Sequence, residues 1–337
     1  TATWNGFTGL IEFEDVRDLG GDYNDGLPPA EPYATIADPQ GTELNRLQLR
    51  WQMNQHFAAT IGRQTVEFDD KRFLDGSNTR QDTRTLDALR GDLTMGAFMA
   101  AYVYVDHVNN TTAEYNDLET EGHLLNASYA FSEQFKLTGF MYALDFDTAS
   151  AINQSSNTIG LRATGEFAAL GIDFDYAASV ANQRDYGNAA VNYDLDYWQA
   201  SLSAERGEWS GRVWYESLGG DGVRGFFVPL GSSNNFQGWA SALTTKPADG
   251  VNDFNVTVQY EPEWAPDSLE GLAFMARYYD FEAERTGVDY GNELDMSVGS
   301  QISDRANWSL EYADYQAGDA GSPAERTRVR FMVQYTF

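Results

Sequence analysis

Apolar and polar residues alternate along most of this chain, and that pattern limits the folds it can adopt. In the last segment, ERTRVRFMVQYTF, one face carries Val329, Phe331, Val333, Tyr335 and Phe337, and the other carries Arg, Met, Gln and Thr. The segments LNRLQLRWQ and NTIGLRATGEF alternate in the same way. A period of two belongs to half-buried β-strands, because an amphipathic helix would repeat at about 3.6 residues.

The alternation predicts about sixteen strands. Their ranges are 3–13, 41–52, 56–64, 83–92, 96–106, 120–131, 135–146, 156–166, 169–181, 192–204, 208–217, 250–260, 268–281, 290–302, 306–316 and 325–337. The connections alternate between short turns and long polar loops, a layout typical of bacterial outer-membrane barrels. We therefore expect one all-β domain over residues 1–337. It would be a transmembrane antiparallel up-and-down β-barrel with long extracellular loops and short periplasmic turns.

Composition excludes several other classes of protein. Lys and Arg number 22 against 51 Asp and Glu, a net charge of −29 that argues against a nucleic-acid partner. The absence of Cys excludes disulfides and thiolate sites. The longest uncharged apolar-rich run, MGAFMAAYVYV at 95–105, is too short for a membrane-spanning helix. The first residues, TATWNGF, do not resemble a cleavable signal, so we expect a mature or trimmed form.

A soluble β-sandwich is the main structural alternative, since its strands alternate too. Here the polar faces carry Arg, Gln, Thr and Asp, which favours a water-filled lumen over a dry core. The final strand, ending in Phe337, resembles the terminal assembly signal of outer-membrane barrels. We expect this strand to pair with the first and close the barrel, which removes an exposed sheet edge.

The stretch 62–90, GRQTVEFDDKRFLDGSNTRQDTRTLDALR, resembles the alginate-export family of outer-membrane barrels. In that family a strand ending in G-R-Q runs into a D-D-Q-R-F loop and returns through an R-Q…D-A-L/V-R strand. The matching residues are Gly62, Arg63, Gln64, Asp69, Asp70, Arg72, Phe73, Arg80, Gln81, Thr85, Asp87, Ala88 and Arg90. A weaker match is Pro229, Gly231, Phe236, Gly238 and Trp239. The resemblance implies a related porin, with the bacterial outer membrane as its location.

Projection of the alternation into a barrel predicts which charged residues line the pore. They are Arg46, Arg50, Arg162, Arg212, Arg277, Arg328, Arg330, Asp173 and Asp175. Guanidinium groups suit solutes that carry carboxylates or sugar rings. Basic and acidic residues on opposite walls would set a transverse field across the lumen, or they would neutralise each other in salt bridges. Both interpretations stay open at this point.

A second set of charges belongs to the family-like stretch: Arg63, Asp69, Asp70, Arg72, Arg80, Asp87 and Arg90. These residues would form either a solute site at the mouth or constriction, or a salt-bridged latch that holds the loop in the barrel. The loop 218–249 contains the apolar patch GFFVPLG. That patch would fold into the lumen, pack against another loop, or contact a neighbouring subunit.

The acidic loop 14–40 contains DYNDG, in which Asp22, Asn24 and Asp25 offer oxygen ligands suited to Ca²⁺. Without EF-hand spacing the signal is weak, and a solvated acidic surface is the alternative. Apart from that Ca²⁺ we expect no cofactor.

The chain lacks G-x-S-x-G and H-E-x-x-H motifs, so we expect no catalytic residue and no enzyme. The predicted function is a porin for passive diffusion of small hydrophilic solutes. The alternatives are a channel for acidic oligosaccharides and a plugged structural or adhesin barrel. Expected partners are outer-membrane lipid, lipopolysaccharide and solute, with a homotrimer and a monomer both open.

Overall fold

The computed structural model describes residues 1–20, 23–27, 32, 35–76, 81–112, 116–232, 235–266, 269–319 and 321–337. These residues form one antiparallel sheet with a single short 3₁₀ helix, η1 (Ile152–Gln154). Within the described part of the chain, no helix has the length and apolar character needed to cross a bilayer.

Seventeen strands make up the sheet. They are β1 (Ala2–Trp4), β2 (Phe7–Val16), β3 (Gly41–Gln52), β4 (Phe57–Gln64), β5 (Thr85–Met95), β6 (Phe98–Asn109), β7 (Leu118–Ser132), β8 (Phe135–Phe146), β9 (Ser156–Ala169), β10 (Ile172–Asp185), β11 (Asp194–Arg206), β12 (Trp209–Leu218), β13 (Val251–Tyr260), β14 (Ala273–Glu282), β15 (Asp289–Ser303), β16 (Ala306–Ala317) and β17 (Arg326–Tyr335).

The sixteen predicted strands are β2 to β17, and β1 is the addition. The first predicted strand is interrupted at Asn5 and Gly6, whose φ angles are 47° and 82°. Two successive positive φ angles are typical of the tight turn that joins hairpin strands. Ala2–Trp4 therefore folds back onto the start of β2 as a short hairpin.

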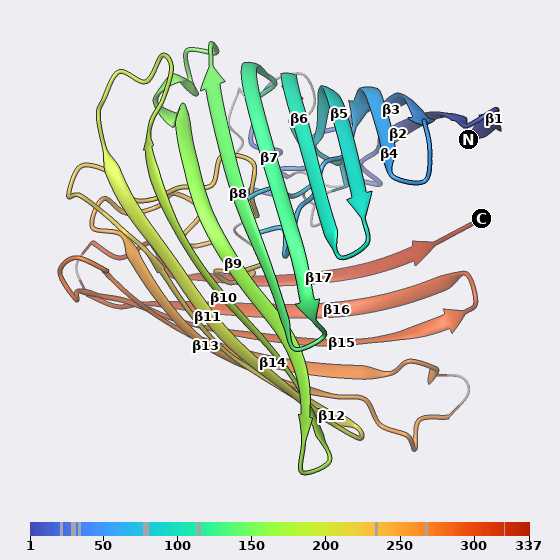
Figure 1. Ribbon diagram of the computed structural model, residues 1–337. Coiled ribbons are helices and arrows are strands. Elements are labelled where there is room, and N and C mark those ends of the chain that lie inside the picture. Colours follow the sequence, from blue (N-terminus) through green and yellow to red (C-terminus); the bar gives the residue numbers. More distant parts are fainter. Residues whose placement is uncertain are drawn as a thin grey trace.

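Each strand pairs with the next one along the chain, so the sheet is a meander that curves into a barrel wall (Figure 1). Both chain ends lie on the same side of the molecule. The sixteen long strands, β2 to β17, require this, because an even number of strands returns the chain to the side on which it began. Among the described residues, β17 pairs with β16 and β2 pairs with β3, and no residue-by-residue pairing joins β17 to β2. Closure of the barrel by this last pairing stays a prediction.

The outer face of the wall is apolar. Leu161, Val180, Val213 and Phe331, on four different strands, each leave between 48% and 65% of their surface exposed. In a soluble protein such a belt would be a liability, but lipid covers it in a membrane barrel. The strand alternation therefore directs apolar residues outward.

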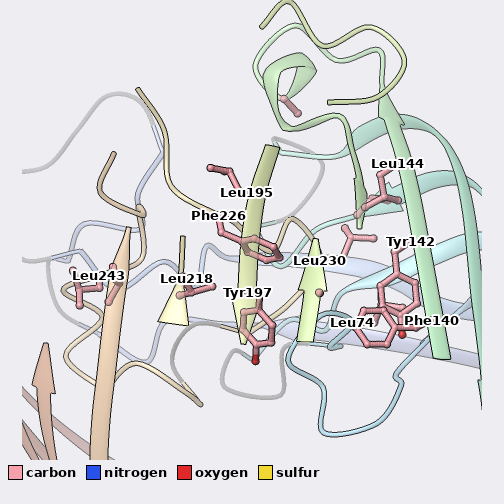
Figure 2. Packing of buried hydrophobic residues seen from close by; sticks show 14 of the residues in the cluster. Leu74, Phe140, Tyr142, Leu144, Leu195, Tyr197, Leu218, Phe226, Leu230 and Leu243 are labelled. Carbon is pink, nitrogen blue, oxygen red and sulfur yellow. The ribbon is translucent and has the colours of Figure 1, made fainter. Parts of the chain in front are cut away.

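The inside of the barrel is not uniformly polar, because two long loops fold into it. The inward residues Val103, Val105 and Leu124 of β6 and β7 have no exposed surface. Figure 2 shows loop residues Leu74, Phe226 and Leu230 beside the wall residues Phe140, Tyr142 and Tyr197, while Leu243 lies farther along the same cluster. The hydrophobic core thus lies between the loops 65–84 and 219–250 and the inner wall.

Candidate functional site

The DDKRF segment (residues 69–73) spans the inside of the barrel from β7 to β12. The Asn126 amide of β7 donates to Asp69 Oδ2 at 2.7 Å. Asp70 Oδ2 lies 2.8 Å from Arg162 Nη1 of β9. Arg72 Nε donates to Glu216 Oε1 of β12 at 2.6 Å. Successive residues of one short loop segment therefore tie together strands that are far apart in the sheet.

The Arg72–Glu216 ion pair is the most deeply buried contact of this segment. The two side chains are 1% and 0% exposed. Glu216 also accepts the Tyr197 hydroxyl at 2.9 Å, and Arg72 Nη1 donates to the Ser232 carbonyl at 2.7 Å. Burial by itself would lower the pKa of Arg72, but Glu216, with smaller contributions from Tyr197 and Asp70, more than offsets it, and the pKa lies above its ordinary value.

Phe73 completes the segment with an aromatic cluster. Its ring lies 5.1 Å from the rings of both Phe140 and Tyr197, and 6.2 Å from that of Phe226. Because Phe226 belongs to loop 219–250, this cluster joins the two loops to each other as well as to the wall. The neighbouring Leu74 bridges to Leu230 through the backbone.

Loop 219–250 approaches Arg72 closely because two glycines permit it. A Cβ at Gly231 would stand 2.1 Å from the Arg72 carbonyl oxygen. A Cβ at Gly238, whose φ is 85°, would stand 2.3 Å from the Glu293 carboxyl carbon. The Phe236 ring lies 5.0 Å from the Arg72 guanidinium carbon. Gly231 and Phe236 of the second set of family-like residues thus lie against the arginine of the first, and Gly238 lies against Glu293.

The tip of loop 219–250 docks on β15 and β17 through its backbone. Asp295 accepts the Trp239 N–H at 3.2 Å, and Glu293 accepts the Ala240 N–H at 2.6 Å. Arg328 donates to the Trp239 carbonyl at 3.0 Å, and Arg326 to the Ala240 carbonyl at 3.1 Å. Acids and arginines of the inner wall therefore hold the loop inside the lumen.

One cross-strand row of the inner wall carries three arginines. Arg212 pairs with Thr257, Thr257 with Arg277, and the row continues through Asp295 and Ala313 to Arg328. The guanidinium of Arg212 lies over the Trp214 ring at 5.0 Å. Arg277 donates to the Thr257 and Tyr279 hydroxyls at 2.7 and 2.9 Å.

The other end of this row is acidic. Through Ser203, Arg212 is in register with Asp175 of β10 and then with Glu166 of β9. Asp173 lies on the same face of β10, two residues from Asp175. Acidic groups thus gather at the β9–β10 end of the row and arginines at the other end, where Asp295 lies between Arg277 and Arg328. This arrangement would create a transverse field.

A cavity of about 670 Å³ opens between this row and the loops. Arg162, Arg212, Trp214 and Asp175 line it from the wall, and loop residues Asp70, Asn235 and Phe236 line it from the inside. The cavity therefore combines cations, carboxylates, an amide and aromatic rings around a space suited to one small solute.

The sequence over residues 3–201 matches the alginate export family. That span covers more than half of the 337 residues. The chain belongs to the alginate export family. None of the curated proteins matches it in sequence.

Solved structures show which barrels the fold resembles. OccK9 (OpdG) of Pseudomonas aeruginosa superposes with a TM-score of 0.70 at 15% identity, covering 98% of this chain and 87% of its own. OpdK of the same organism, crystallised with vanillate, gives 0.68 at 17%, covering 86% and 77%. OccAB2 of Acinetobacter baumannii gives 0.66 at 18%, covering 86% and 76%. This member of the alginate export family is an outer-membrane β-barrel of the porin type, and its likenesses are channels rather than enzymes.

The remaining predicted pore residues of this family member also point inward, where each has a carboxylate partner. Arg46 Nε donates to Glu12 at 2.8 Å, and Arg50 Nη1 lies 3.2 Å from Asp92. Arg330 Nη2 lies 2.6 Å from Glu311. Each of these three arginines therefore forms a salt bridge on the lumen side of the wall. By contrast, Arg212 and Arg277 have no carboxylate within ion-pair distance in the described ranges.

The charges of the first family motif are divided between the two faces of the barrel. Arg63 of β4 and Asp87 of β5 form a bidentate pair at 2.9 and 3.1 Å. Arg63 is in register with Asp87 and with Leu47 of β3, whose side chain faces outward. Because of this parity they lie outside the lumen, unlike the mouth position that we expected. Arg90 faces inward, with its guanidinium 5.3 Å from the Phe68 ring. Arg80 lies outside the described residues.

The candidate Ca²⁺ residues are only partly described, since Asp22 lies outside the described ranges. Asn24 Oδ1 accepts the Gly26 N–H, and Asp25 Oδ1 accepts the Leu27 N–H. These are ordinary turn contacts. Among the described residues, no group of three or more His, Cys, Asp or Glu side chains could hold a metal ion. The Ca²⁺ site stays a prediction.

Sequence reasoning missed the partners of the motif. It did not connect Glu216 to Arg72, and it did not single out Tyr197 or Asn126. The apolar run at 95–105 was the available signal, because a strand that is apolar on both faces must be covered on both. The apolar patch GFFVPLG of the long loop is buried in the same hydrophobic cluster as Val103 and Val105, and its Phe226 has no exposed surface.

Proposed function

We propose that this protein is an outer-membrane channel for small hydrophilic solutes that carry a carboxylate together with hydroxyl groups. One observation supports this most directly. Arg212 and Arg277 face the lumen, and in the part of the chain that the structure describes neither has a carboxylate within ion-pair distance, although Asp295 is in register with Arg277. The acids Glu216, Glu293 and Asp295 of the same wall are occupied by the infolded loops. The infolded loops therefore bind carboxylates of the wall, while the guanidinium groups of Arg212 and Arg277 stay available to solutes.

The chemistry of the cavity favours a solute of this kind. A guanidinium group offers planar donors that match a carboxylate, and stacking over Trp214 orients them. Ser201 and Ser203 line the same cavity and can hydrogen bond to hydroxyl groups. The acids on the other part of the row, Asp173 and Asp175, would accept hydroxyl protons. They would also repel solutes whose negative charge is placed at both ends.

The comparisons agree with this chemistry. OpdK was crystallised with vanillate, and the family is named for alginate export. Both compounds are hydroxylated carboxylates. Because the cavity of about 670 Å³ suits one small molecule, we favour single sugar acids or hydroxylated aromatic acids over long oligosaccharides.

The test is the ion current of the purified protein in a planar bilayer, with vanillate and its neutral alcohol as blockers. We expect an open current that vanillate blocks and the alcohol does not. In the double variant R212Q/R277Q the half-blocking concentration of vanillate should rise about tenfold, since charge-assisted hydrogen bonds are lost. The matched control is R184Q, because Arg184 is 66% exposed and pairs with Asp194 at the far end of β10.

Equal block by the acid and the alcohol would contradict the proposal. A protein that folds but conducts no current would support the plugged structural barrel, since the infolded loops then fill the lumen. Contacts with lipopolysaccharide, Ca²⁺ bound by the acidic loops, and a homotrimer remain predictions that this experiment does not address.

A further inference from the structure

Asp70 occupies the place that a solute carboxylate would take at Arg162. Its Oδ2 lies 2.8 Å from Arg162 Nη1, and the Arg162 side chain is only 12% exposed. The other contacts of this guanidinium are neutral: Ser179 Oγ at 2.9 Å and Gln199 Oε1 at 3.4 Å. Asp70 is thus the residue that neutralises Arg162.

This carboxylate comes from the infolded loop and not from the barrel wall. Asp70 and Arg162 both line the cavity that also contains Arg212. A solute held at Arg212 would therefore lie in the same space as the Asp70–Arg162 pair. The loop thus places the Asp70 carboxylate against Arg162, which would otherwise face the cavity without a carboxylate partner at this distance.

The backbone around Asp70 indicates that its position is enforced. Asp69 and Lys71, on either side, have φ angles of 51° and 67°. Such left-handed conformations are unfavourable for a lysine and persist only where the surrounding structure imposes them. Here the Asp69–Asn126 and Arg72–Glu216 bonds fix the two ends of this turn and direct Asp70 at the wall.

We propose that Asp70 is an internal counter-ion, which competes with solute carboxylates for Arg162 and so sets the channel's affinity for them. The inference rests on the proposed function, because it concerns the same cavity and the same class of solute. Asp70 is a specificity-determining residue in this view, and the wild-type channel binds carboxylates more weakly than its arginines allow. Weak binding suits a channel, since a solute must also leave the site.

The experiment compares D70N with D69N in the vanillate block of ion current. Each variant removes one carboxylate from neighbouring positions of the same loop, and of the two only Asp70 lies within ion-pair distance of Arg162. Asparagine also retains the Oδ1 atom with which Asp70 accepts the Arg72 N–H. We expect the half-blocking concentration to fall about tenfold in D70N and to change little in D69N, the size expected for one charge-assisted hydrogen bond.

A second comparison tests the role of Arg162. In D70N/R162Q the gain in affinity should disappear, while R162Q alone should weaken the block by vanillate, because it leaves the Asp70 carboxylate unpaired beside the solute. Equal effects of D70N and D69N, or a gain that persists in D70N/R162Q, would overturn the proposal. Failure of the proposed function looks different: vanillate and its alcohol would then block the wild type and D70N alike. Heat-modifiable mobility of each variant on a gel verifies that the barrel has folded.

Discussion

Two parts of the inner wall, β5–β8 and β12–β17, have the same strand geometry but different inward side chains. On β5–β8 many inward residues are apolar, as at Val103 and Leu124, and they are buried in one cluster with residues of the loops. On β12–β17 the inward residues are charged, and they hold a loop tip by its backbone or face the cavity. One part of the wall is therefore a protein core and the other is a channel surface. The position of a residue inside a barrel does not by itself make it pore-lining.

The largest effect should come from the ion pair that joins the loops to the charged part of the wall. R72A would leave Glu216 buried and unpaired, which should lower the free energy of unfolding by about 3–5 kcal/mol. Urea unfolding in detergent, followed by tryptophan fluorescence, measures it. In R72M/E216M the loss should be much smaller, because no buried charge remains. An equal loss in both variants would mean that packing and not charge joins the loops to the wall.

A smaller effect should come from the apolar part of the wall. Leu74 of loop 65–84 is 1% exposed where the loop covers this wall, so L74A should cost about 2–4 kcal/mol through the cavity it creates. Leu89 of β5 is 50% exposed on the outer face and provides the matched control. L89A should cost clearly less in the same urea experiment, because detergent replaces the lost contacts. Similar losses in the two variants would argue that the loops do not cover this part of the wall.

The smallest effect concerns pH and separates the two ends of the DDKRF segment. Desolvation by the surrounding protein raises the pKa of Asp69, although the Asn126 amide opposes the shift. A raised pKa means that the folded state favours the protonated acid, and this stabilisation is lost as pH rises through the folded value. D69N should therefore be slightly more stable than the wild type at neutral pH, and the difference should vanish as pH falls below the ordinary aspartate range. A difference that stays constant with pH in the urea assay would contradict this assignment.

The alternation of residues was sufficient to predict all sixteen main strands, and it assigned Arg46, Arg212 and Arg277 to the inner face. It misplaced Arg63 and Asp87, which we grouped with the mouth because they belong to the family motif. The register of β4 and β5 directs both side chains outward. A motif defined by sequence thus contains residues that act on opposite faces of one sheet.

The sequence by itself therefore determined the barrel, its strand ranges and the face on which most charges lie, because side-chain direction in a strand depends only on a local period of two. Only the tertiary structure decided which charges are paired. Arg72 and Glu216 are separated by 144 residues, and Asp70 reaches Arg162 only because the loop folds inward. Such contacts depend on where a long loop docks, and the short-range pattern of a strand carries no information about that.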